Sequence, residues 1–168
     1  WHAALRVAQR RAADADEARK WGELADVVAT AFARMFWNED LGCLYDVIND
    51  DRWDDSIRPN QIIAVALPDC PLPRCQQQSV VEVVERELVT PRGLRTLAPG
   101  APGYRGRYGV SWESRDRAYH QGTAWPWLMG QFVEACLRVH DFSDEARDRC
   151  RGLLAGWGEH LREAGLGT

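Results

Sequence analysis

The chain has 168 residues, of which 45% are hydrophobic and 27% are charged, a balance that is typical of one globular domain and excludes a disordered segment. Its net charge of −4 excludes the basic surface expected of a protein that binds nucleic acid or an anionic membrane. No apolar run is long enough to span a bilayer, and the first residues do not resemble a signal peptide. Five cysteines with scattered spacing predict free thiols in a reducing cytoplasm, without disulfides or a zinc site.

Helical patterns dominate the first half of the chain. Residues 1–18 are rich in alanine and arginine and favour a helix. A second helix is indicated by an apolar stripe with three- and four-residue spacing, which consists of Leu24, Val27, Val28, Ala31, Phe32, Met35 and Phe36. Residues 43–47 predict a short extended piece, and residues 49–55 predict an acidic loop. Pro59 suits the first turn of a helix that carries the apolar run 62–67.

The second half alternates long loops with helices. A helix is expected over residues 74–89, with Val80, Val81, Val84 and Leu88 facing inward. Residues 90–108 are rich in glycine, proline and arginine and predict a long loop that includes a short hairpin. The next helix is expected over residues 122–139, and Ser143 is a suitable N-cap for a last helix over residues 143–162. Periodicity therefore predicts a single all-α domain.

The first candidate site lies where the helix after Pro59 begins. Arg58, Asn60 and Gln61 surround the expected start of that helix, and exposed hydrogen-bond donors at such a start suit an oxygen-rich ligand. The alternative is that Arg58 forms an ion pair with Asp54 or Asp55, and that the other side chains cap the helix.

The second candidate site is a stretch that mixes acid, imidazole, amide and indole groups. Its members are Asp116, Tyr119, His120, Gln121, Trp125 and Trp127. A flat indole ring covers the apolar face of a pyranose while polar neighbours bind its hydroxyl groups, so this combination suits a sugar. The alternative is that Asp116 pairs with Arg115 or Arg117, and that the tryptophans belong to the core.

Three blocks of the sequence resemble one family. They are residues 58–61 (RPNQ), 88–97 (LVTPRGLRTL) and 119–127 (YHQGTAWPW). In order and spacing, and together with residues 36–38 and 42–47, they resemble the C-terminal amylo-α-1,6-glucosidase domain of glycogen debranching enzymes. The resemblance covers nearly the whole chain.

The resemblance implies a partial (α/α)6 toroid of paired helices, with long loops at the pocket end. Residues 1–168 would form one domain, the central part of the toroid, truncated at both ends. The implied reaction is inverting hydrolysis of α-1,6-linked glucose in a branched α-glucan (glycogen or limit dextrin), without a cofactor or a metal. The family's acid, an aspartate of a Thr-Trp-Met-Asp block, would precede this chain, and its base, a glutamate, would follow it.

By this resemblance the chain contributes substrate-binding groups to the pocket wall. The residues to which a binding role transfers are Arg58, Asn60, Gln61, Asp116, Tyr119, His120, Gln121, Trp125 and Trp127. Asp116 is also the in-chain candidate for a catalytic carboxyl, although its neighbours Arg115 and Arg117 favour the charged form and hence a hydrogen-bond acceptor.

Three other classes of protein stay open. One is a carbohydrate-binding or scaffold protein of the same fold that hydrolyses nothing. Another is a toroid glycosidase of the glucoamylase or trehalase type. The third is a helical interaction domain, which would expose Trp125 and Trp127 in an apolar patch.

Overall fold

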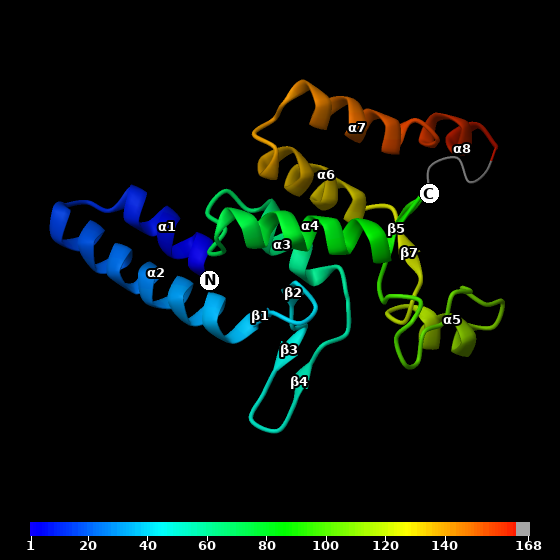
Figure 1. Cartoon of the computed structure of the whole chain (residues 1–168), viewed down its shortest axis with the longest axis horizontal. Coiled ribbons are helices and arrows are strands. Elements are labelled where there is room, and N and C mark those ends of the chain that lie inside the picture. Colours follow the sequence, from blue (N-terminus) through cyan, green and yellow to red (C-terminus); the bar gives the residue numbers. More distant parts are fainter. Residues whose placement is uncertain (164–168) are drawn as a thin grey trace.

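A computed structural model describes residues 1–163 of the chain. Helices dominate this part, which confirms the all-α prediction (Figure 1). The helices are α1 (His2–Arg11), α2 (Ala15–Phe36), α3 (Asn60–Ala66), α4 (Arg74–Leu88), α5 (Trp112–Ala118), α6 (Leu128–Val139), α7 (Asp144–Leu154) and α8 (Trp157–Glu163). The short strands are β1 (Trp37–Asn38), β2 (Cys43–Leu44), β3 (Val47–Ile48), β4 (Trp53–Asp54), β5 (Val89–Thr90), β6 (Gly93–Arg95) and β7 (Ala124–Trp125). Within the described residues, no helix combines the length and the apolar character that crossing a lipid bilayer requires.

The core lies between α3, α4 and α6, and α7 packs on α6 (Figure 1). The four residues of α4 that were predicted to face inward are all buried, and Val80, Val84 and Leu88 are fully so. Phe132 of α6 is fully buried among them. Burial of each such side chain stabilises the fold by about 1.5–3 kcal/mol, so the three helices form a firm base for the loops that follow them.

The first two helices form a hairpin that extends from one side of this core (Figure 1). The chain turns between α1 and α2, where the Asp14 carboxylate caps α2 by accepting a hydrogen bond from the amide of Glu17 (2.8 Å). The apolar stripe of α2 is covered along only part of its length. Phe32 and Phe36 stack on each other and pack against the core, whereas Val27 is 64% exposed.

A small sheet brings two distant blocks of sequence together. Its strands are antiparallel and lie in the order β5-β6-β7, so that Leu94 of β6 pairs with Trp125 of β7. Gly93 has a φ of 148°, and a Cβ at that position would lie 2.4 Å from the carbonyl oxygen of Trp125. Glycine is therefore required here, both for its backbone conformation and for the close approach of β7.

The sheet also explains why the helix predicted over residues 122–139 begins later. Gly122 has a φ of 131°, which a helix does not use, and Ala124 and Trp125 pair with β6 instead. The helix α6 starts only at Leu128. Long-range strand pairing thus overrides the local helical pattern.

Helix α5 falls in a segment for which no helix was predicted. The last predicted helix is confirmed at its start, because the Ser143 hydroxyl accepts a hydrogen bond from the amide of Ala146 (3.3 Å), but it is divided into α7 and α8. The predicted loop at residues 90–108 does include part of a hairpin, formed by β5 and β6.

Candidate functional site

Arg58 lies directly before α3 and joins the two candidate stretches. Its Nη1 donates hydrogen bonds to the carbonyl oxygens of Thr96 (3.1 Å) and His120 (2.6 Å). Its Nη2 donates to Oε1 of Gln121 (3.1 Å). The guanidinium carries five donors in a fixed planar fork, so one side chain holds two separate loops at a defined distance.

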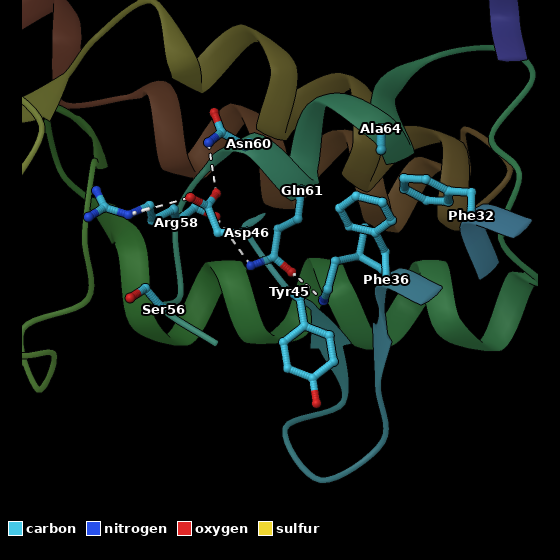
Figure 2. A pocket seen from close by; sticks show the side chains of 10 residues that line it. Phe32, Phe36, Tyr45, Asp46, Ser56, Arg58, Asn60, Gln61 and Ala64 are labelled. Carbon is cyan, nitrogen blue, oxygen red and sulfur yellow. Dashed lines mark hydrogen bonds and ion pairs between the residues drawn. The ribbon is translucent and has the colours of Figure 1, made fainter. Parts of the chain in front are cut away.

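Asp46, after β2, completes the surroundings of Arg58 (Figure 2). Its Oδ2 lies 3.6 Å from Nε of Arg58, and its Oδ1 accepts a hydrogen bond from Nδ2 of Asn60 (2.8 Å). The Asp46 side chain is only 10% exposed. The ion pair of Arg58 is therefore made with Asp46, and Asp54 and Asp55 do not take this place.

A small pocket of about 130 Å³ opens beside this carboxylate, and we call it the Asp46 pocket (Figure 2). Its lining combines aromatic rings from α2 with polar groups from the start of α3. The lining residues are Phe32, Phe36, Leu44, Tyr45, Asp46, Ser56, Arg58, Asn60, Gln61 and Ala64.

Gln61 supports the Asp46 pocket through hydrogen bonds to two backbone atoms. The side chain is buried, its Oε1 accepts a hydrogen bond from the amide of Leu44 (3.2 Å), and its Nε2 donates to the carbonyl oxygen of Arg58 (3.2 Å). Both ends of the amide are thus bonded to protein. Gln61 holds β2 against the start of α3 and has little capacity left for a ligand.

A second cavity, of about 300 Å³, shares Arg58 and Asn60 with the Asp46 pocket and receives side chains from both candidate stretches. We call it the tryptophan pocket. Its lining consists of Arg58, Pro59, Asn60, Thr96, Tyr119, His120, Trp125, Trp127 and Leu128. Its volume lies at the lower end of the range of about 300–1,000 Å³ that is usual for small-molecule sites.

An aromatic cluster forms one wall of the tryptophan pocket. The ring centroids of Tyr119 and Trp125 are 4.6 Å apart, and Nε1 of Trp125 donates a hydrogen bond to the carbonyl oxygen of Tyr119 (3.1 Å). Tyr108 packs against both rings, and the ring centroid of His120 lies 4.9 Å from that of Tyr119. Trp127 is 65% exposed, so much of its indole surface is open to a ligand.

The remaining predicted residues occupy different positions. The side-chain oxygen of Gln121 accepts a hydrogen bond from Arg58. Asp116 is exposed on α5 and lies outside the lining of both pockets. The predictions did not include Thr96, which is buried and whose hydroxyl accepts a hydrogen bond from the amide of Gly122 (2.9 Å). The predicted binding residues also omit Asp46 and Tyr45, although both fall within the block 42–47 that carries the resemblance.

Two pKa shifts near the site have clear causes. Hydrogen bonds from the hydroxyl and the amide of Ser56 lower the pKa of Asp54. Burial raises the pKa of the Cys43 thiol to about 11, so this group stays protonated at neutral pH. All five cysteines are free thiols, as predicted. Within residues 1–163, no cluster of histidine, cysteine and acidic side chains is suited to hold a metal ion.

A cavity that combines open indole and phenol rings with imidazole and amide groups is typical of a carbohydrate-binding protein. The family described as amylo-alpha-1,6-glucosidase matches residues 1–168, and the chain belongs to this family. One relative is the glycogen debranching enzyme of Saccharomyces cerevisiae, which is 33% identical over 105 residues. That alignment covers 58% of this chain and 7% of the yeast protein, so the chain spans a small part of the relative's length.

Proposed function

We propose that this chain forms the pocket wall of a glycoside hydrolase that releases α-1,6-linked glucose at the branch points of glycogen or limit dextrin. The observation that carries the proposal is the tryptophan pocket, because residues of both candidate stretches line it. In it, Trp127 and Tyr119 offer ring faces to the sugar, and His120 and Asn60 offer polar groups to its hydroxyls. Arg58, Gln61 and Gln121 hold these groups in place through their bonds to protein.

The proposed reaction is inverting, and its acid and base come from other parts of the full-length protein. Inversion requires two carboxyl groups about 6.5–9.5 Å apart, with a water molecule between the base and the sugar. Among the described residues that line the two pockets, Asp46 is the single carboxylate, and Asn60 and Arg58 engage its oxygens. The described residues therefore supply no acid–base pair at these two pockets.

We also propose that residues 1–168 form the central part of a cytoplasmic (α/α)6 toroid. The exposed part of the α2 stripe supports this arrangement, since further helices of the toroid would cover Val27 and its neighbours. Three of the helix pairs in the chain, α1–α2, α3–α4 and α6–α7, pack against each other as a toroid of paired helices requires.

The test is glucose release by the full-length protein from branched limit dextrin and from linear α-1,4-linked oligosaccharides. We expect release from the branched substrate, and a loss of about tenfold or more in kcat/KM for Trp127→Ala, because the ring face is lost. Trp1→Ala is the matched control, since Trp1 is also exposed and lies outside both pockets. Residues 1–168 alone should release no glucose.

Preferred release from linear substrates would assign the chain to a different toroid glycosidase. Binding of oligosaccharides by the full-length protein without any hydrolysis would assign it to the carbohydrate-binding class. Either result would contradict the proposed activity.

A further inference from the structure

The β3–β4 hairpin presents an exposed aromatic ring beside the Asp46 pocket. Trp53 lies on β4, opposite Ile48 of β3, and is 48% exposed. Its ring meets the ring of Tyr45 edge to face, with centroids 5.1 Å apart and an interplanar angle of 82°. Tyr45 itself lines the Asp46 pocket (Figure 2). Aromatic surface therefore continues from this pocket onto the hairpin.

The backbone of the hairpin is held at both ends. At its base, the amide of Asp46 donates to the carbonyl oxygen of Asp54 (2.8 Å), and the Asp54 carboxylate accepts a hydrogen bond from the amide of Ser56 (3.0 Å). At its tip, the amide of Arg52 donates to Oδ1 of Asn49 (2.7 Å). Trp53 thus projects from an ordered ribbon, and its ring is presented in a defined position without the entropic cost of ordering a loose loop.

The two pockets share two lining residues, and the hairpin adjoins one of these pockets. Arg58 and Asn60 line both the tryptophan pocket and the Asp46 pocket, and Tyr45 connects the Asp46 pocket to Trp53. A glucan chain is a row of pyranose rings, each with an apolar face and a rim of hydroxyl groups. Such a chain suits adjoining surfaces that offer both aromatic rings and polar side chains.

We propose that Trp53, supported by Tyr45, is an outer stacking site for glucose units that lie beyond the unit in the tryptophan pocket. This inference rests on the proposed function and adds a residue that determines the preference for long substrates. Trp53 contacts only the distant part of the substrate, so its contribution depends on the length of the glucan chain.

The experiment compares two substrates of the full-length protein: limit dextrin and the smallest branched oligosaccharide that carries an α-1,6-linked glucose. Trp53→Ala should lower kcat/KM for limit dextrin about tenfold, because one stacked pyranose face is lost. The value for the small substrate should change by less than about twofold, since that substrate does not reach the hairpin. Trp53→Tyr keeps a flat ring and should restore most of the activity, and Trp1→Ala is the control for removal of an exposed indole.

The melting temperature of each variant is measured alongside the kinetics. An equal loss on both substrates, or a fall in melting temperature without a selective loss on limit dextrin, would show that Trp53 packs against another part of the protein and would overturn the inference. No change on either substrate would overturn it as well. If the unmodified protein releases glucose from neither substrate, the proposed function itself fails and this inference fails with it.

Discussion

The two stretches that form the tryptophan pocket differ in how freely their side chains meet a ligand. At the start of α3, the polar groups of Arg58 and Gln61 are bonded to protein atoms. In the second stretch, Tyr119 is 43% exposed, and His120 and Trp127 are exposed as well. Residues with the same expected role thus serve two purposes, because Arg58 and Gln61 position the cavity, whereas Tyr119, His120 and Trp127 face its interior.

This difference predicts two kinds of variant. Removal of a positioning residue should lower both the free energy of unfolding and the activity, since protein–protein bonds are lost. Removal of a contact residue should lower activity and leave the free energy of unfolding nearly unchanged. The predictions below test that division, from the largest expected effect to the smallest.

Arg58→Ala should cause the largest loss. The variant leaves three acceptors without their donor and frees the loop at residues 119–121 to move. We expect the free energy of unfolding to fall by about 2–3 kcal/mol, and kcat/KM of the full-length protein to fall about hundredfold, as a misplacement of about 1 Å does. Chemical denaturation measures the free energy of unfolding, and glucose-release kinetics measure kcat/KM. Arg92→Ala is the control, because Arg92 is exposed and donates to a single carbonyl oxygen, that of Gly156.

Gly93→Ala should come next, through the position of Trp125. The new Cβ would collide with the backbone of β7, and the backbone at φ 148° would be strained. We expect a loss of about 1–3 kcal/mol in the free energy of unfolding. Gly100→Ala is the matched control, since its Cβ would meet no atom within 4 Å. Equal stability of the two variants would show that β7 does not approach Gly93 so closely.

His120→Ala tests the role of a contact residue. Arg58 bonds to the carbonyl oxygen of His120, which alanine retains, so the positioning contact survives while the imidazole is lost. We expect kcat/KM to fall about tenfold, with a change of less than about 0.5 kcal/mol in the free energy of unfolding. His140→Ala, at the exposed end of α6, should change neither quantity. A large loss of stability in His120→Ala would place the imidazole among the positioning groups.

The smallest effect concerns the pH dependence of stability. Ser56 lowers the pKa of Asp54 in the folded protein, so this carboxylate contributes stability above its unfolded pKa and loses it as the pH falls through the folded pKa. Asp54→Asn should therefore cost less than about 1 kcal/mol at neutral pH, and the difference should vanish in acid. Denaturation curves across the acidic range measure this difference in the free energy of unfolding. Asp50→Asn, at the exposed tip of the hairpin, is the control. A difference that persists in acid would point to packing instead of charge.

The sequence predicted those features that depend on local pattern. The inward face of α4 and the capping of α7 by Ser143 follow from spacing and from one side chain next to a helix start. The later start of α6 depends on the pairing of Trp125 with Leu94, which lies far away in the sequence. No local pattern reports such a pairing.

The same limit applies to the site. The blocks with family resemblance indicated which stretches belong together, and the tryptophan pocket brings them to one cavity. The partners of Arg58 were beyond prediction, because nearby Asp54 and Asp55 are the obvious candidates and the actual partners are Asp46 and three acceptors from distant loops. Whether a polar side chain is free or bonded depends on such contacts, and composition does not encode them.

The most direct test of the division between positioning and contact residues is a crystal structure of the full-length protein with a bound glucosyl oligosaccharide. We expect a glucose unit in the tryptophan pocket, in contact with His120 and Trp127, while Arg58 keeps its hydrogen bonds to Thr96, His120 and Gln121. A glucose unit bound away from this pocket, or an Arg58 side chain that leaves its protein partners to bind the sugar, would contradict the account.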